Sequence, residues 1–197
     1  MKNEITIIIL IFEEELDIIF KCLNSVKNFK ITIIDNANNI SKKEKILEKF
    51  KINKYVLNKK NLGFGKGNNI GIKNCDTKYL LILNPDCIIH ENTILALQKT
   101  LEKYPDCFIS TPTLVDENNN LTQNASAFPE VSSIKEIIKI DGDICCQSAL
   151  GAVMFCRTDE LKKIGMFDEK YFIFYEDDDL CKRVRNLKKS IIQIYNA

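Results

Sequence analysis

The sequence contains no tryptophan, one histidine (His90), four prolines and seven glycines among its 197 residues. Its eight cysteines include no Cys-x-x-Cys pair, so a zinc site made of Cys and His is not expected. The start of the chain does not read as a signal peptide, and no apolar run is long enough for a membrane span. We therefore expect a soluble cytoplasmic protein in which most of the cysteines are small core residues rather than disulfide partners.

A strong charge of either sign is also missing. The chain carries 28 basic and 27 acidic residues, which give a formal net charge of +1. This balance provides no whole-protein field that would attract nucleic acid or anionic lipid, so no nucleic-acid partner is predicted. The hydrophobic fraction of 45% and the length suit one ordinary globular domain covering 1–197.

The hydrophobic pattern alternates between strand-like and helix-like segments. Strands are predicted at 5–12, 31–34, 55–57, 79–83, 108–115 and 190–195, and 145–156 is predicted to be one strand or a kinked pair. Helices are predicted at 16–26, 91–104, 158–164 and 176–188, with a further helix that begins at Ser41. Ser41 and Glu44 have the spacing of a capping box, and Thr158 or Asp159 would cap the helix at 158–164.

Strands that alternate with helices favour an α/β fold with a mostly parallel sheet flanked by helices, as in Rossmann-like nucleotide-binding proteins. The carboxyl ends of parallel strands lie at one edge of such a sheet, which is where ligands bind. Five polar residues follow predicted strands and should share this edge. They are Asp35, Asn36, Asn61, Asn84 and Asp86.

The turn Asn84-Pro85-Asp86 directly follows a buried strand. A carboxylate in this position could bind Mg²⁺ or Mn²⁺ together with phosphate oxygens of a substrate. The alternative is an ordinary turn that ends the strand.

The segment 61–71 contains four of the seven glycines, at positions 63, 65, 67 and 71. Glycines allow the backbone to approach a ligand closely, and Asn68 and Asn69 would add amide donors at a helix N-terminus. The segment lacks the Gly-Lys-Ser/Thr of a phosphate-binding loop and does not open a first strand–helix turn. The alternative is a flexible turn.

Four consecutive carboxylates, Glu176 to Asp179, open the last predicted helix. Acidic residues stabilise any helix N-terminus, but crowding can also raise the pKa of one carboxyl toward the range of a general base. Leu180 and Val184 should face the core, which places Asp177 over the strand ends and leaves Asp178 in solvent. Asp179 could pair with Arg183 or act as the base instead.

Together these segments resemble the family 2 inverting glycosyltransferases, most closely the rhamnosyltransferase-like branch. The resemblance rests on five segments in order: Asp35-Asn36, the glycine segment 61–71, the turn 84–86, the pair Gly151-Ala152, and 167–183 with its Phe-Asp-Glu and Tyr-Glu-Asp-x-Asp-Leu motifs. It covers nearly the whole chain.

The resemblance implies a GT-A fold and transfer of a sugar, with rhamnose a candidate, from a UDP- or TDP-linked donor. The acceptor would be a saccharide or a lipid-linked saccharide of cell-surface polysaccharide synthesis, reached at the inner face of the membrane. The implied cofactor is Mg²⁺ or Mn²⁺. The implied roles are base or ribose contacts for Asp35 and Asn36, donor contacts for Asn61, Gly65, Asn69 and Asn84, metal binding for Asp86, and general base for Asp177 with Asp179 as the second candidate. Residues 1–105 would bind the nucleotide sugar and 106–197 would form the acceptor side.

The sequence departs from the family pattern in four places. Ile11-Phe12-Glu13 replaces the usual Thr-Tyr-Asn, and the neutral Asn84 replaces the first aspartate of the D-x-D motif. In addition, no histidine follows Lys182, and the chain stops at Ala197. We therefore expect a truncated or incomplete acceptor side and little activity. Two other functions are considered. One is a nucleotide-sugar-binding protein without catalysis, and the other is a sugar-nucleotide nucleotidylyltransferase, whose basic glycine-rich first loop is missing here.

Overall fold

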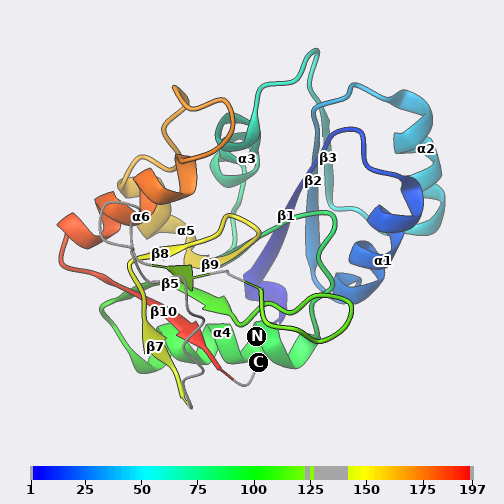
Figure 1. The fold of residues 1–197 in the computed structure, drawn as a ribbon. Helices are drawn as coiled ribbons and strands as arrows, with labels where there is room; N and C mark the ends of the chain where they lie inside the picture. The colour runs from blue at the N-terminus through cyan, green and yellow to red at the C-terminus, as the bar shows by residue number, and fades with distance from the viewer. Residues whose placement is uncertain (1, 123–124, 127–141, 196–197) are drawn as a thin grey trace.

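Parallel strands form the first half of the sheet in a computed structural model that describes residues 2–122, 125–126 and 142–195 (Figure 1). A short 3-10 helix, Lys2–Glu4, precedes the first strand. The strands are β1 (Ile5–Ile11), β2 (Lys30–Asp35), β3 (Lys54–Leu57) and β4 (Tyr79–Leu83), in the order β3-β2-β1-β4. Helices α1 (Leu16–Val26), α2 (Ile40–Lys49) and α3 (Phe64–Lys73) connect them. All three pairings are parallel, as the alternating pattern predicted.

The second half completes a mixed eight-stranded sheet in the order β3-β2-β1-β4-β9-β5-β10-β7. Its elements are α4 (Glu91–Lys103), β5 (Cys107–Pro112), β7 (Ile144–Cys145), β9 (Val153–Arg157), α5 (Thr158–Lys163), α6 (Glu176–Asn186) and β10 (Ser190–Ile194). Strand β9 runs antiparallel to both β4 and β5, whereas β10 is parallel to β5. A separate pair joins β6 (Ala125–Ser126) to β8 (Ser148–Ala149). The predicted α/β class, with a mostly parallel sheet flanked by helices, is confirmed.

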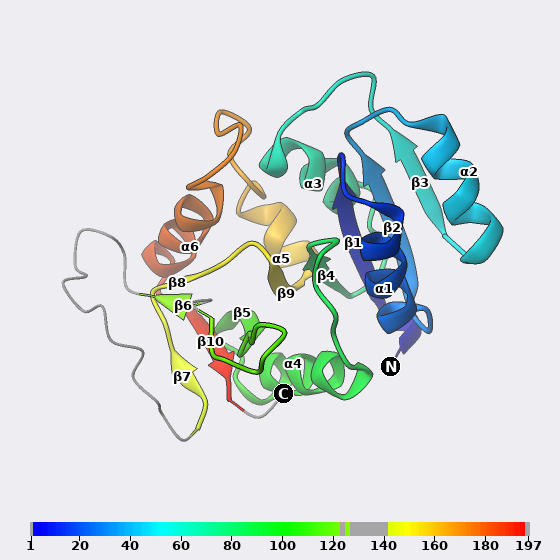
Figure 2. The ribbon, with the colours of Figure 1, turned by 45° about the vertical axis from the view of Figure 1, so that its right-hand side comes forward.

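Helices cover both faces of the sheet (Figure 2). Alternate residues of β1 point to opposite faces, so Ile7 and Ile9 pack in one core and Ile8 packs in the other. The first core also contains buried residues of α1, α2 and α4, and the second contains residues of α3, α5 and α6. No helix among the described residues is long and apolar enough to cross a membrane.

The predicted cap of α2 is wrong by two residues. The helix begins at Ile40, and the Asn39 side chain accepts a hydrogen bond from the backbone N–H of Lys42. Asn39 lies three residues before that N–H, which is the ordinary capping geometry, so Ser41 lies inside the helix. The cap predicted for α5 is also wrong, because the helix starts at Thr158 and Arg157 precedes it without a side-chain cap.

The glycine segment is a helix rather than a loop. Helix α3 starts at Phe64, and its glycines allow it to lie close to the sheet. A Cβ on Gly67 would be 2.6 Å from Leu10 Cδ1, and one on Gly71 would be 2.6 Å from Ile8 Cγ2. These glycines therefore serve helix–strand packing, and only Gly63, at the N-cap with φ +81°, requires the glycine backbone itself.

The predicted strand at 145–156 is divided into β7, β8 and β9. The strand predicted at 108–115 ends at Pro112, and Val115 instead forms an isolated bridge with Leu121.

Candidate functional site

The carboxyl ends of β1, β2, β3 and β4 lie at one edge of the sheet because these strands are parallel. The amino end of β9 lies at the same edge because β9 runs antiparallel to β4, with Val153 opposite Leu83. We call this edge the strand-end rim. It brings together the segments after β2, β3 and β4 and the turn before β9, which are distant in sequence.

Asp35 is the last residue of β2 and has no solvent exposure. Its Oδ1 accepts a hydrogen bond of 2.8 Å from the Ala37 N–H, and its Oδ2 accepts one of 2.9 Å from the Tyr55 hydroxyl. Burial, followed by the nearby Asp35 charge, raises the pKa of Tyr55 well above its usual range, so this hydroxyl remains a donor. The carboxylate is therefore held in one orientation at the rim.

Asn36 connects three segments of the rim. Its Nδ2 donates to Asn61 Oδ1 at 3.1 Å and to the Gly63 carbonyl at 3.2 Å. Its Oδ1 accepts from Asn58 Nδ2 at 2.8 Å, and only 3% of the residue is exposed. The amide thus fixes the β3–α3 connection against the end of β2.

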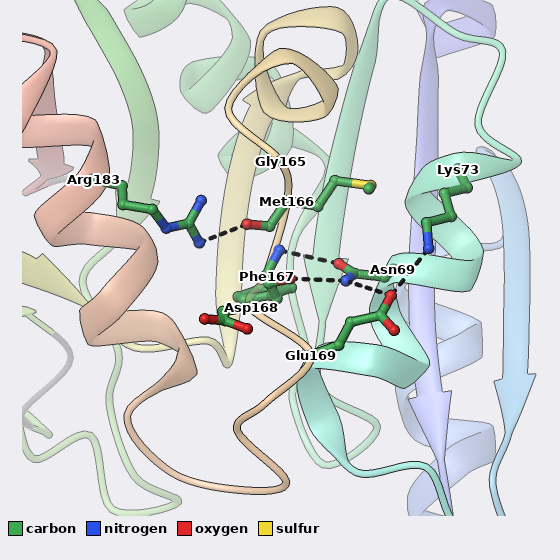
Figure 3. Close-up of a pocket in the computed structure, with 8 residues that line it drawn as sticks. All are labelled: Asn69, Lys73, Gly165, Met166, Phe167, Asp168, Glu169 and Arg183. Carbon is green, nitrogen blue, oxygen red and sulfur yellow. Dashed lines mark hydrogen bonds and ion pairs between the residues drawn. The ribbon is translucent and has the colours of Figure 1, made fainter.

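Asn69 connects α3 to the segment before α6 (Figure 3). Its Nδ2 donates to the Phe167 carbonyl at 2.9 Å, and its Oδ1 accepts from the Phe167 N–H at 3.1 Å. It is 1% exposed, and a Cβ on Gly65, one turn earlier, would be 3.1 Å from Phe167 Cβ. Both residues therefore hold the 167–169 segment in place.

A cavity of about 440 Å³ opens beside Asn69. Residues of α3, α6 and the loop after α5 line it: Asn69, Lys73, Gly165, Met166, Phe167, Asp168, Glu169 and Arg183 (Figure 3). Asn69 is the only one of the sequence-predicted site residues in this lining, so the cavity is distinct from the strand-end rim. Arg183 is engaged by its own protein, since it binds Asp179 and the carbonyls of Ile164 and Met166.

The turn after β4 presents Asp86 to solvent. The Asn84 N–H donates to the Ala152 carbonyl at 2.9 Å, which fixes the turn against the start of β9. Among the described side chains, the Cys87 thiol is the one that donates a hydrogen bond to the Asp86 carboxylate, at 3.7 Å. Burial, followed by the Asp86 charge, raises the pKa of Cys87 to about 12, so the thiol stays neutral.

These residues fit a divalent cation only in part. In the described ranges no three His, Cys, Asp or Glu side chains are grouped so that they could hold a metal ion. An exposed single carboxylate suits a hard cation that also binds the oxygens of a phosphorylated ligand.

Asp177 lies on the other side of the same turn region. Its Oδ2 accepts a hydrogen bond of 3.0 Å from the Gly151 N–H, and its Oδ1 accepts one of 2.9 Å from the Asp178 N–H. Gly151 precedes Ala152, which contacts Asn84. The two-residue turn Gly151-Ala152 therefore connects the Asp177 carboxylate with the turn that carries Asp86.

The neighbouring carboxylates have other partners. Asp178 is half-buried and accepts a hydrogen bond from the Ser148 hydroxyl, so the prediction that it lies in solvent is wrong. Asp179 binds the Arg183 guanidinium at 2.8 Å, as the i,i+4 spacing allowed.

Glu176 is the carboxyl whose pKa is raised by its surroundings. Burial is the main cause, and the charges of Asp177 and Asp178 add to it. The residue is 5% exposed, and its Oε2 has no hydrogen-bond partner among the described residues. The pKa increase predicted for this acidic run therefore falls on Glu176.

Some contributors could not be found from the sequence. Ser148 and the Gly151 N–H meet α6 across about thirty residues, without any local signal. The contact made by Lys42 also has no local signal in the sequence. Its Nζ donates to the carbonyls of Phe12, at 3.1 Å, and Glu14, at 2.8 Å, and these bonds hold the chain that follows β1.

Comparison with known proteins gives a family match for most of the chain. A profile described as "Glycosyl transferase family 2" matches residues 6–160. Rhamnosyltransferase WbbL of Escherichia coli (strain K12) is 29% identical over 142 residues, which are 62% of this chain and 54% of that protein. Low-salt glycan biosynthesis hexosyltransferase Agl10 of Haloferax volcanii is 24% identical over 211 residues, covering 100% of this chain and 67% of that protein. The chain thus spans between half and two thirds of the length of these relatives.

Solved structures with a similar fold have low sequence identity. A crystal structure of GalNAc-T7 with UDP, GalNAc and Mn²⁺ has a TM-score of 0.75 and 14% identity, covering 98% of this chain and 42% of that one. Staphylococcus aureus TarS has a TM-score of 0.68 and 16% identity, covering 98% of this chain and 35% of the other. At these identities the likeness concerns the fold.

Proposed function

The chain belongs to glycosyl transferase family 2 and has the GT-A fold, and on this premise we propose that it is an inverting glycosyltransferase. The reaction is a single displacement, in which an acceptor hydroxyl attacks the anomeric carbon of a nucleoside-diphosphate sugar and the diphosphate leaves. The names of the two relatives support a hexose, with rhamnose as one candidate, as the transferred sugar. The acceptor is a saccharide, lipid-linked in cell-surface polysaccharide synthesis.

Residues 1–105 form the donor side in this proposal. Asp35 and Asn36 contact the base or ribose of UDP or TDP, and Asn61 and Asn84 lie beside the phosphates and sugar. The hydrogen bonds of Asp35 and Asn36 fix the end of β2 and the β3–α3 connection at this site, and a preorganised site binds a ligand at a lower entropic cost. Gly65 and Asn69 contribute indirectly, through the 167–169 segment that they hold.

Asp86 would hold Mg²⁺ or Mn²⁺ jointly with the diphosphate of the donor. When bound, the cation supplies positive charge that stabilises the departing diphosphate. The exposure of Asp86 and its lack of a protein cation partner among the described residues support this assignment. The Mn²⁺ and UDP in the GalNAc-T7 structure are a precedent in another protein with this fold.

Asp177 is the general base, which removes the proton from the acceptor hydroxyl, and residues 106–197 form the acceptor side. The observation that carries the proposal is the Gly151-Ala152 turn. It bonds to Asp177 on one side and to Asn84 on the other, so the base candidate and the metal candidate share one edge. Asp179 is the weaker candidate because Arg183 already binds its carboxylate.

A calorimetric titration with UDP and TDP, with and without Mn²⁺, tests the donor site. We expect Asp86→Asn to abolish the metal-dependent part of the affinity and the matched surface change Asp106→Asn to leave it intact. Unchanged metal dependence in Asp86→Asn would contradict the assignment.

A panel of nucleotide sugars, assayed for transfer to a soluble saccharide, tests the reaction itself. Inverted product that requires Asp177 supports the proposal. Nucleotide binding without any transfer would leave a nucleotide-sugar-binding protein, and formation of a nucleotide sugar from a sugar phosphate would indicate a nucleotidylyltransferase.

A further inference from the structure

The loop before α6 exposes five consecutive apolar or aromatic side chains, at 171–175. The exposed fractions rise from 37% at Tyr171 to 71% at Phe174, and Tyr175 is 63% exposed. A soluble surface rarely keeps a contiguous apolar patch of this kind without a partner. We call residues 171–175 the apolar loop.

The backbone holds the apolar loop outward. The Phe172 carbonyl accepts a hydrogen bond of 2.9 Å from the Phe64 N–H, which anchors the loop to the start of α3. Phe174 and Tyr175 both have left-handed backbones, with φ of 70° and 69°. Non-glycine residues adopt this conformation at a cost, and such strain is typical of functional loops.

Lysines lie beside the apolar loop. Lys170 directly precedes it, and Lys60 is three residues from Gly63, which places its Cα within about 11 Å of that glycine. The site where a Cβ would stand on Gly63 is 2.1 Å from the Phe172 carbonyl oxygen, so Gly63 touches the loop. Lys59, Lys60 and Lys170 are exposed and form no ion pair with any residue in the described ranges.

These lysines continue a basic segment. Residues 42–73 contain ten lysines and two glutamates in a chain whose net charge is +1. Of these lysines, Lys42 is buried, and Lys66 and Lys73 pair with Glu169, so they add no free charge to this surface. In both ribbon views the β3–α3 connection and the loop before α6 project from the same end of the molecule (Figures 1 and 2). The apolar loop and the basic connection therefore present one surface, although the whole protein is nearly neutral.

We propose that this surface docks on an anionic lipid bilayer, with the apolar loop entering the headgroup region and Lys59, Lys60 and Lys170 contacting acidic headgroups. Exposed aromatic and aliphatic side chains next to lysines are the combination that binds a membrane interface. Asp177 follows the loop by two residues, so docking brings the base to the bilayer surface. The inference rests on the proposed function, in which Asp177 is the general base. Docking of the loop would explain how a lipid-linked acceptor reaches this residue.

A saccharide platform is the competing occupant of the apolar loop. Saccharide sites combine an aromatic face with hydrogen-bonding side chains for the sugar hydroxyls. Residues 172–174 are Phe-Ile-Phe, so the polar groups of the loop are confined to the hydroxyls of Tyr171 and Tyr175 at its two ends. The flanking lysines add no reason for a neutral sugar. The carboxylates that follow the loop are bonded within the protein, Asp177 to Gly151, Asp178 to Ser148 and Asp179 to Arg183. The free charges beside the loop are therefore those of Lys59, Lys60 and Lys170, and they favour the anionic bilayer.

The test is co-sedimentation of this chain with two kinds of vesicle. One is made of phosphatidylcholine alone, and the other also contains about 30% of the anionic lipid phosphatidylglycerol. The wild type should bind the anionic vesicles. Lys59→Gln with Lys60→Gln should lower the partition coefficient about 25-fold, at about fivefold per lysine. The double variant Ile173→Ser with Phe174→Ser should lower it at least about tenfold.

The matched control is Lys27→Gln with Lys99→Gln, which should change binding less than about twofold. Both lysines are exposed and lie outside this surface, Lys27 directly after α1 and Lys99 on α4. Wild-type chain that does not bind anionic vesicles would overturn the inference. Normal vesicle binding by the serine variant, together with a weakened affinity for a soluble saccharide, would overturn it in favour of the saccharide platform. Transfer to a soluble acceptor is measured separately, so failure of transfer with intact vesicle binding would count against the proposed function alone.

Discussion

Replacing Gly63 by alanine should destabilise the protein and displace the loop that leads to the proposed base. Gly63 has φ +81° and ψ 177°, a region that is essentially restricted to glycine. An alanine Cβ there would be 2.1 Å from the Phe172 carbonyl oxygen, so the backbone must move. The same oxygen accepts the Phe64 N–H, and that hydrogen bond should break.

The expected loss has two parts. The strained backbone costs about 2 kcal/mol, and the lost hydrogen bond costs about 1 kcal/mol. A loss of about 3 kcal/mol should lower the Tm of a chain of this length by about 9 °C. Because the contact is with backbone rather than with a flexible side chain, relaxation must shift the loop that precedes Asp177.

Gly165 provides the matched control. It also has a positive φ, +93°, but a Cβ there would have nothing within 4 Å. Gly165→Ala should therefore cost only the strain, about 1–2 kcal/mol, and should leave sugar transfer unchanged. Urea unfolding monitored by circular dichroism measures both variants. Equal losses of stability, or full transfer activity in Gly63→Ala, would refute the reasoning.

Three further predictions concern α6 and its support. Asp177→Asn should lower kcat by about 10²–10⁴-fold in a transfer assay without changing donor affinity, whereas Asp159→Asn on α5 should have no effect. Full turnover by Asp177→Asn would exclude Asp177 as the base. Glu176→Gln should stabilise the fold near pH 8. Folding raises the pKa of Glu176 above 4.5, so its contribution to stability is fully present below pH 4.5 and is lost as the pH rises through the folded pKa, whereas glutamine stays neutral throughout. Urea midpoints from pH 4 to 8 check this, and a gain that is largest at pH 4 would contradict it. Asn69→Ala should lower the free energy of unfolding by about 3 kcal/mol, since it leaves the buried Phe167 N–H and carbonyl without the Asn69 amide. The control Asn74→Ala, at an exposed position, should lower it by less than about 1 kcal/mol in the same urea measurement.

The first four strands and their parallel pairing could be predicted from the sequence because their hydrophobic patterns are strong and local. Ile5–Ile11 is continuously apolar, as expected for a strand buried on both faces, and each following strand is separated by a helical pattern. The rim positions of Asp35, Asn36 and Asp86 followed directly, since strand ends in a parallel sheet share an edge. The assigned roles of these residues stay predictions.

The errors arise where nonlocal packing decides the structure. Glycines at 65, 67 and 71 read as a loop, but Leu10, Ile8 and Phe167, which belong to other elements, require small residues on that face of α3. The Ser148–Asp178 hydrogen bond likewise depends on where β8 lies relative to α6. Cap positions failed for a simpler reason, since Asn39 and Ser41 are both good caps and the sequence does not rank them.

The turn Gly151-Ala152 limits how this protein could be redesigned. An insertion of one residue there would move the Gly151 N–H away from Asp177, the Ala152 carbonyl away from Asn84, or both. A larger residue at 151 would also meet the Phe64 ring, 2.9 Å from the Cβ position. Loop grafts that aim at new acceptors should therefore keep the length and the glycine of this turn. Their variation belongs in the exposed turn at 116–120, where the hydrogen bonds that Asp116 and Asn120 make with described residues lie within the turn.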